Sequence, residues 1–302
     1  MTGSFTSAAT LEEAVIALGS GARPVAGGTD LVVGARQGKK PLPDAIVAID
    51  RIDSLRELTE TESGGGGGIR LGSLVTHETI VASPAVRARF TALADASAIV
   101  GSHATRAQGT IGGNVMNASP AMDTGGALLC FGATVTLRSH GGERTVPIGE
   151  LWTGPGATSA GEGELLVAID VPASAEGTGS AYVRLEYRRQ MEIAVVGATA
   201  VVTMEGDRVS DARIAITALA PTIRRVAEAE AALVHAAAGT EAVSTAAAAA
   251  AAGSAPIGDV RASAEYRTAM AEVVARRAIA GALARARGET VTIPASDALY
   301  GA

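Results

Sequence analysis

Two glycine pairs constrain what this chain can fold into more than any other feature of its sequence. The first pair lies in VAGGTDL (Val25–Leu31) and the second lies in TIGGN (Thr110–Asn114). In each stretch an apolar residue precedes the glycines and a small polar residue follows them. Because glycine has no side chain, it allows unusual backbone angles and the close approach of other atoms. The sequence therefore predicts two places where the backbone must approach something closely.

Both stretches are also suited to holding an anion. Consecutive backbone N–H groups in such a turn form a concavity that binds negative charge. Thr29, Thr110 and Asn114 add hydroxyl and amide donors. A diphosphate needs many donors, so two such loops facing each other would suit it. Either pair also fits a tight turn or a helix cap, and the spacing alone does not identify the ligand.

Composition and charge limit the classes of protein to consider. The chain has 302 residues, of which 47% are hydrophobic, and this predicts about two domains with a large core. Its net charge is −6, and an acidic protein is a poor candidate for binding nucleic-acid phosphates. The single cysteine, Cys130, excludes an intrachain disulfide, a protein-held iron–sulfur cluster and a cysteine-based zinc site.

Targeting and metal motifs are not found in the sequence. There is no signal peptide pattern and no apolar run long enough to span a membrane, so we expect a cytoplasmic protein. His77 and Glu78 begin an H-E-x-x-H motif, but Val81 stands at its last position. The histidines show no metal-ligand spacing. His103 is a candidate catalytic base, although a structural or surface role is the simpler interpretation.

The order of hydrophobic patterns predicts the arrangement of elements. A small α/β unit is expected within residues 11–50, mostly helices from 74 to 129, strands from 133 to 218, and helices after that. The stretch SGGGGG (Ser63–Gly68) is interpreted as a surface hairpin loop rather than a phosphate-binding loop. The stretch SAEGTGS (Ser174–Ser180) is interpreted as a linker between an N-terminal ligand-binding part and a C-terminal part.

Taken in order, these stretches resemble a known family. VAGGTDL followed by TIGGNVMNASPAMD is similar to the FAD-binding middle subunit of the molybdenum hydroxylases, the family of xanthine dehydrogenase and carbon monoxide dehydrogenase. Further segments resemble that family in the same order, namely LGSLVTHETI, ELLVAIDVP, YRRQMEIAVVGA and DVRASAEYRTAMAEVVARRAI. The resemblance spans roughly residues 5–287.

The resemblance implies a fold and a division of the chain. The implied fold is α+β, with a two-part FAD-binding domain of the MurB-like, PCMH-type flavin fold followed by a smaller C-terminal domain of a β-sheet and helices. The FAD-binding domain is expected at residues 1–175, with subdomains at about 1–58 and 59–175. A C-terminal domain of the CO dehydrogenase flavoprotein type is expected at residues 178–288, and residues 289–302 form a tail.

The same resemblance implies which residues bind FAD. The two glycine motifs would wrap the FAD diphosphate and neighbouring atoms, and Asp123 would contact polar groups of the cofactor. Leu166 falls where the family packs an apolar side chain near the flavin or adenine, and Arg184 falls where a lysine often stands near the isoalloxazine. The residues implied within the glycine motifs are Val25, Ala26, Gly27, Gly28, Thr29, Asp30, Leu31, Thr110, Ile111, Gly112, Gly113 and Asn114.

The resemblance further implies a role in electron transfer. FAD would be bound non-covalently and would itself accept and donate electrons, so the absence of a catalytic triad is expected. Partner subunits would hold the other cofactors: a large subunit with the molybdenum cofactor and a small subunit with 2Fe–2S clusters. Electrons would pass from these clusters through FAD to NAD or another acceptor. Two alternatives stay open, a stand-alone FAD oxidoreductase of the MurB-like fold and a non-redox assembly subunit.

Overall fold

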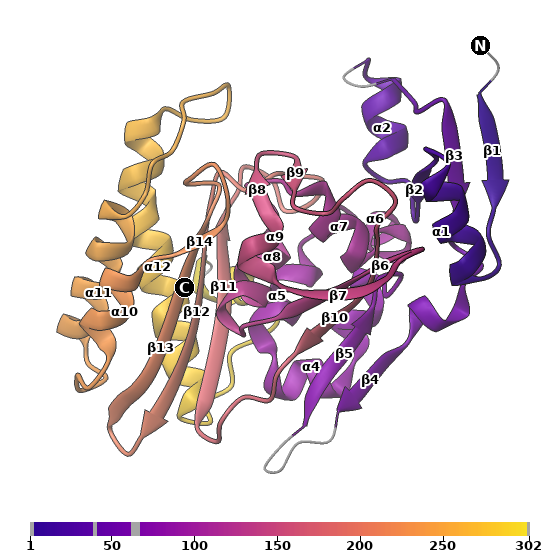
Figure 1. Cartoon of the computed structure of the whole chain (residues 1–302). Coiled ribbons are helices and arrows are strands. Elements are labelled where there is room, and N and C mark those ends of the chain that lie inside the picture. Colours follow the sequence, from indigo (N-terminus) through magenta and orange to yellow (C-terminus); the bar gives the residue numbers. More distant parts are fainter. Residues whose placement is uncertain (1–2, 39–40, 62–66, 301–302) are drawn as a thin grey trace.

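Three groups of elements follow one another along the chain and lie side by side (Figure 1). The computed structural model describes residues 3–38, 41–61 and 67–300. The predicted hairpin loop at Ser63–Gly68 lies outside these residues except for its last two glycines. Three hydrophobic cores correspond to the three groups, and neighbouring groups share residues in two of them.

The first group is a small parallel sheet with two helices, as the sequence predicted for this region. Its strands lie in the order β1-β3-β2. The first helix begins where the Thr10 hydroxyl accepts a hydrogen bond from the Glu13 N–H at 3.1 Å. The elements are β1 (Ser4–Ser7), α1 (Leu11–Gly19), β2 (Arg23–Val25), α2 (Leu31–Arg36) and β3 (Ala45–Ala48), followed by a 3-10 turn at Asp53–Arg56.

The second group packs six helices against an antiparallel sheet with the strand order β4-β5-β10-β6-β7. The central strand β10 is apolar along most of its length because its two faces contribute to two different cores. The strands are β4 (Leu58–Thr61), β5 (Gly68–Gly72), β6 (Thr134–Ser139), β7 (Gly142–Pro147), β8 (Trp152–Gly154), β9 (Ala157–Thr158) and β10 (Leu165–Val171). The helices are α3 (His77–Ala82), α4 (Pro84–Arg89), α5 (Thr91–Ala98), α6 (His103–Gln108), α7 (Ile111–Asn117) and α8 (Asp123–Cys130), with the short turn α9 (Ile148–Leu151) after them.

The third group is a sheet with helices on both faces. Helix α12 covers one face of β11 and β12, and α5 and α8 of the second group contact the same strands. The last three residues of the predicted linker, 178–180, belong to β11 rather than to a linker. The elements are β11 (Thr178–Leu185), β12 (Val196–Glu205), β13 (Arg208–Thr217), β14 (Arg224–Arg225), α10 (Ala227–Leu233), α11 (Thr240–Ala252), α12 (Ala264–Ala286) and α13 (Ala295–Tyr300).

The second and third groups are joined by close packing and by a buried ion pair. A Cβ atom on Gly126 of α8 would lie 2.4 Å from Thr199 Oγ1 on β12, so glycine is required for this approach. The Asp95 carboxylate of α5 accepts two hydrogen bonds from the Arg285 guanidinium of α12, at 2.6 and 3.0 Å. The same carboxylate accepts a hydrogen bond from the N–H group of Tyr182 on β11, at 3.1 Å.

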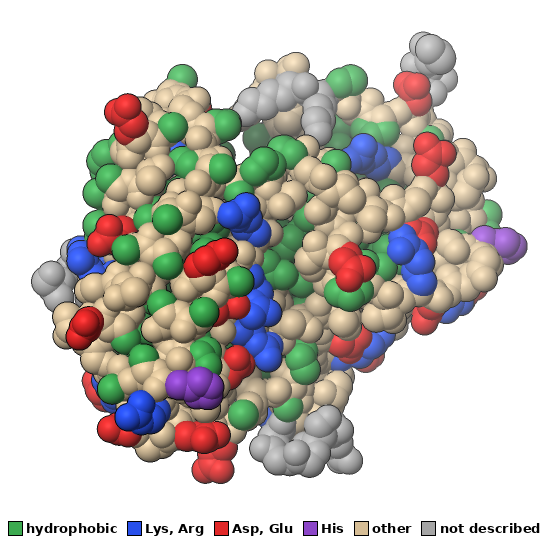
Figure 2. Space-filling view, turned by 60° about the vertical axis from the view of Figure 1, so that its left-hand side comes forward, with side chains coloured by type: hydrophobic (Ala, Val, Ile, Leu, Met, Phe, Trp, Pro, Cys, Tyr) green, Lys and Arg blue, Asp and Glu red, His purple; other side chains and the backbone are tan. Residues whose placement is uncertain are grey.

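The surface carries charges of both signs. Acidic and basic side chains are interspersed on the face shown in Figure 2, with hydrophobic side chains between them. Within the described ranges, none of the helices combines the length and the apolar character needed to cross a membrane.

Candidate functional site

The first glycine motif lies against Gln108 and Gly109, the two residues that lead into the second motif. A Cβ atom on Gly27 would lie 1.9 Å from the carbonyl oxygen of Gln108, so only glycine permits this contact. A Cβ atom on Gly109 would lie 3.6 Å from Thr29 Oγ1. Tertiary packing therefore brings together the two loops that the sequence singled out, although roughly eighty residues separate them along the chain.

The second motif begins helix α7, and its backbone N–H groups donate hydrogen bonds to other atoms of the protein. The first four N–H groups of α7 donate in turn to the Val75 carbonyl, the Ser73 carbonyl, the Thr110 hydroxyl and the Thr110 carbonyl, at 2.9, 3.0, 3.1 and 2.9 Å. Thr110 is thus a helix cap, which was one of the two interpretations of a glycine pair. The N–H groups of the second motif from Ile111 to Asn114 are therefore not free to bind an anion.

The first motif, between β2 and α2, keeps its backbone N–H groups free. No described residue accepts a hydrogen bond from the N–H groups of residues 27–31. Gly28 has a φ of +69°, an angle that glycine adopts without strain and that turns the chain here. Successive unpaired N–H groups in a turn attract an anion. The first motif therefore has the donor set that a diphosphate requires.

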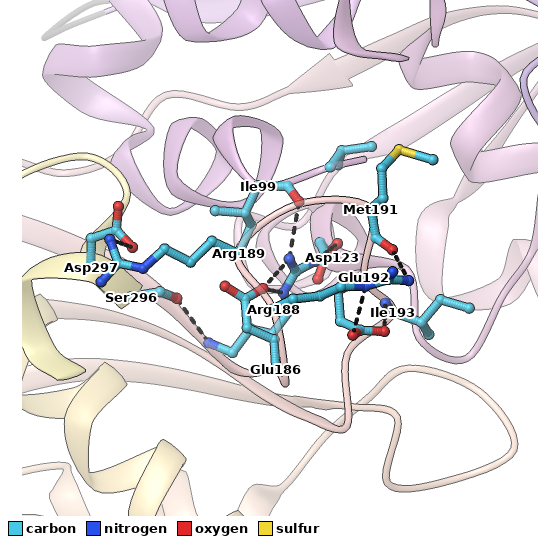
Figure 3. Close-up of polar contacts among 12 residues, drawn as sticks. Ile99, Asp123, Glu186, Arg188, Arg189, Met191, Glu192, Ile193, Ser296 and Asp297 are labelled. Atoms are coloured by element: carbon cyan, nitrogen blue, oxygen red, sulfur yellow. Dashed lines mark hydrogen bonds and ion pairs between the residues drawn. The ribbon is translucent and has the colours of Figure 1, made fainter. Parts of the chain in front are cut away.

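Asp123 and Arg184 form a buried ion pair at the boundary between the second and third groups. Figure 3 labels Asp123 together with Ile99 and Glu186, the other two partners of the Arg184 guanidinium. Arg184 Nη1 donates to Asp123 Oδ2 at 2.8 Å, and Nη2 donates to the Ile99 carbonyl at 3.1 Å. Arg184 Nε donates to the Glu186 carboxylate at 2.6 Å, and the Tyr182 hydroxyl donates to Asp123 Oδ1 at 2.7 Å. Burial raises the pKa of Asp123, and the Arg184 guanidinium opposes this rise. The two residues hold each other in place across the boundary.

Helix α7, which begins with the second glycine motif, contacts both α8 and β10, the strand on which Leu166 lies. Thr124 Oγ1 donates to Asn114 Oδ1 at 2.7 Å, so the second glycine motif is adjacent to the start of α8, where Asp123 lies. Leu166 is buried on β10, in the core against which α7 packs. The contacts of Asp123, Leu166 and Arg184 with FAD stay predictions.

Two polar side chains that the sequence analysis did not assign to the cofactor site lie beside the glycine motifs. His77 Nδ1 and Ser73 Oγ are buried and have no hydrogen-bond partner among the described residues. The only sequence signal was the stretch LGSLVTHETI, which contributed to the family resemblance as a whole. Unpaired buried polar atoms are rare in proteins, and an ordered water or a bound ligand is the usual partner for them. Their position supports a polar ligand at this junction.

Valine at Gly28 or at Gly113 is expected to reduce the flavin content of the purified protein. Valine at Gly28 must adopt a left-handed backbone angle, which costs about 1–2 kcal/mol and therefore weakens FAD binding roughly tenfold. Gly113 is exposed, and a Cβ atom there would meet only Thr110 Oγ1, at 3.0 Å. The measurement is flavin absorbance per chain, with circular dichroism as a check of folding.

A matched control for both variants is Gly34→Val, because a Cβ atom on Gly34 in α2 has no described atom within 4 Å. This variant is expected to keep a normal flavin content. Normal flavin content in both Gly28→Val and Gly113→Val would show that the motifs do not bind the cofactor.

Comparisons with known proteins bear on the identity of this ligand. Residues 2–174 match the family model described as the FAD binding domain in molybdopterin dehydrogenase. Residues 181–282 match the family model described as the CO dehydrogenase flavoprotein C-terminal domain. The first match alone spans more than half of the 302 residues.

Individual relatives cover nearly the whole chain. The chain is 35% identical over 268 residues to the carbon monoxide dehydrogenase medium chain of Hydrogenophaga pseudoflava, which amounts to 89% of this chain and 91% of that protein. It is 29% identical over 289 residues to the putative xanthine dehydrogenase FAD-binding subunit of Escherichia coli, or 95% of this chain and 98% of that protein.

Solved structures share the same fold. A chain of carbon monoxide dehydrogenase from Hydrogenophaga pseudoflava matches with a TM-score of 0.88 at 35% identity, over 94% of this chain and 98% of that chain. A chain of quinoline 2-oxidoreductase from Pseudomonas putida 86 matches with a TM-score of 0.86 at 27% identity, over 95% of this chain and 98% of that chain.

Proposed function

This chain belongs to the FAD-binding subunits of the molybdenum hydroxylase family, and from that premise we propose that it relays electrons through a non-covalently bound FAD. The observation that carries the proposal is the run of unpaired backbone N–H groups at residues 27–31, closed on one side by the second glycine motif. A diphosphate supplies only acceptor atoms, so it matches this set of donors. The buried unpaired atoms of Ser73 and His77 at the same junction also fit a polar ligand.

The protein's own part in this function is to bind and orient the cofactor. FAD supplies the chemistry, because its flavin accepts and donates electrons reversibly. The first glycine motif holds the diphosphate with backbone donors, and the contact between Gly27 and Gln108 fixes this loop against the second motif. Asp123, Leu166 and Arg184 are proposed to contact other parts of FAD, as the family resemblance implies. The Asp123–Arg184 pair then places one end of this site against the third group.

We propose that partner subunits supply the rest of the electron path. A large subunit with the molybdenum cofactor oxidises the substrate, and a small subunit with 2Fe–2S clusters passes the electrons to this FAD. NAD or another acceptor then takes them. Within the described residues, no three His, Cys, Asp or Glu side chains gather as a metal site requires. We further propose a cytoplasmic location and a division into residues 1–175, 178–288 and a tail at 289–302.

The first experiment tests the cofactor. Acid precipitation of the purified protein is expected to release a yellow supernatant that contains FAD rather than FMN. Flavin that stays with the precipitated protein would contradict non-covalent binding. A protein that contains no flavin, and takes up none on reconstitution, would favour the non-redox assembly subunit.

The second experiment tests the electron path. The chain is produced alone and together with the two partner subunits, and a panel of purines, aldehydes, aromatic heterocycles and carbon monoxide is added without oxygen. Bleaching of the flavin by one of these substrates is expected only in the complex, because in the proposed path the large subunit oxidises the substrate. Bleaching at the same rate in the isolated chain would replace the relay by a stand-alone oxidoreductase.

A further inference from the structure

His77 lies at the junction of the two glycine motifs. It is the first residue of α3, and its backbone N–H donates to the Gly109 carbonyl at 3.1 Å. A Cβ atom on Gly109 would lie 3.5 Å from Cδ2 of the His77 ring and 3.6 Å from Thr29 Oγ1. The imidazole therefore packs beside the residue that precedes the second motif and close to the first motif.

The His77 imidazole is buried, yet no described residue forms a hydrogen bond with either ring nitrogen. Only 1% of the residue is exposed, and Nδ1 is buried without a partner. Leaving a buried polar atom unpaired costs about 1–3 kcal/mol, so native proteins pair such atoms with protein groups, water or a ligand. Ser73 Oγ, four residues earlier and next to Gly112, is unpaired in the same way. One segment thus places two unused polar atoms beside the motifs.

The surroundings of His77 keep its ring neutral. Burial lowers the pKa of His77 to about 4, and the positive charge of Arg106 on α6 contributes to this shift. Arg106 donates to the Val100 carbonyl at 3.1 Å and contacts His103 Nδ1 at 3.1 Å. Burial lowers the pKa of Arg106, and the negative charge of Glu78 opposes this shift. At neutral pH the His77 ring therefore carries one N–H donor and no charge.

We propose that the neutral His77 imidazole donates a hydrogen bond to the diphosphate of FAD at the junction of the two glycine motifs. The assignment rests on the proposed function, and it adds a side-chain donor to the backbone donors of residues 27–31. Phosphate oxygens only accept hydrogen bonds, so they complement a ring N–H that has no acceptor in the described protein. The positive charge of Arg106 nearby favours an anion at the same place.

The test compares His77→Phe with the unchanged chain, each in complex with the two partner subunits. Phenylalanine keeps a ring of similar size and removes both nitrogens. After removal of the flavin, the dissociation constants of FAD, ADP and riboflavin are measured by fluorescence titration. We expect His77→Phe to weaken FAD and ADP by about 10- to 100-fold and to leave riboflavin unchanged, since only the first two carry the diphosphate.

Two further variants separate a hydrogen bond from a packing effect. His77→Gln keeps a side-chain N–H donor and is expected to restore part of the affinity for FAD and ADP. Thr199→Val is the control, because it removes another buried hydroxyl that has no partner among the described residues. Thr199 lies on β12, in the third group, so this variant is expected to leave the dissociation constants of FAD, ADP and riboflavin unchanged. If His77→Phe fails to assemble, His77→Gln and His77→Asn take its place in the same titrations. These two variants are expected to differ in their affinity for FAD, because the glutamine side chain is longer than the asparagine side chain.

The outcomes distinguish this assignment from the proposed function. Unchanged FAD and ADP constants in His77→Phe would overturn the assignment alone and leave a buried water as the partner of the imidazole. An equal loss of riboflavin affinity would also overturn it, because packing rather than the diphosphate contact would then explain the change. An unchanged complex that contains no FAD and binds none would overturn the proposed function itself.

Discussion

Replacing Asp95 with alanine is expected to lower the free energy of unfolding by about 3–5 kcal/mol. The Asp95 carboxylate is fully buried and accepts hydrogen bonds from the Arg285 guanidinium and from the N–H groups of Tyr182 and Ala295, at 2.6 to 3.1 Å. These donors come from three elements of the third group, β11, α12 and α13. Alanine would leave the Arg285 guanidinium with carbonyl acceptors but without its counter-ion, and would leave two buried N–H groups without an acceptor. The loss should therefore weaken the attachment of the third group to α5.

The measurement is urea unfolding followed by circular dichroism. The control is Asp170→Ala, which removes a carboxylate from an ion pair with Arg70 on the surface, where the two side chains are 34% and 45% exposed. Such pairs contribute at most about 1 kcal/mol. The double variant Asp95→Leu, Arg285→Met should recover part of the loss, because it leaves no unpaired buried charge, although the Tyr182 and Ala295 N–H groups still have no acceptor. Similar losses for Asp95→Ala and Asp170→Ala would contradict the role given to the buried pair.

Replacing Gly27 with valine is expected to separate the two glycine motifs and to leave the protein without FAD. The new Cβ atom would lie 1.9 Å from the Gln108 carbonyl oxygen and 2.6 Å from its carbon, and a backbone group cannot move aside as a flexible side chain can. Overpacking usually costs about 1–3 kcal/mol, and a collision with backbone belongs at the upper end of that range or beyond it. The loop with the unpaired N–H groups would no longer face the second motif.

Flavin content and the thermal unfolding midpoint are both measured for Gly27→Val. Gly34→Val serves as the control here too, because its Cβ atom meets open space seven residues further along the same segment. The expected result is a lower midpoint and no bound flavin in Gly27→Val only. A stable Gly27→Val protein with full flavin content would show that the contact between the motifs is not needed for binding.

Much of the architecture was predictable from the sequence because it depends on local patterns. The order of helices and strands follows the spacing of apolar residues, and the structure has mostly helices from 74 to 129 and strands from 133 to 218, as predicted. The family, the fold class and the FAD-binding domain are confirmed by the comparisons. The glycine pairs were recognisable because close approach leaves a requirement for glycine in the sequence itself. The helix α13 within the expected tail was missed, since its six residues give too short a pattern.

Other features of the site were decided only by tertiary structure. Both glycine pairs look alike in sequence, yet the N–H groups of residues 111–114 donate to Ser73, Val75 and Thr110, whereas those of residues 27–31 have no acceptor among the described residues. Arg184 was singled out as a cofactor contact, and the structure shows its guanidinium bound to Asp123, Glu186 and the Ile99 carbonyl.

Features that depend on neighbouring residues could be predicted from the sequence, whereas features that depend on distant segments could not. A turn, a helix or a glycine contact is encoded by the residues that form it, so the sequence by itself determined where the backbone must come close to something. Whether an N–H, a carboxylate or an imidazole is free depends on which distant segment supplies its partner. Only in the folded chain does segment 73–77 reach the second motif, and only there does the His77 imidazole lie close to the first motif without a hydrogen-bond partner among the described residues.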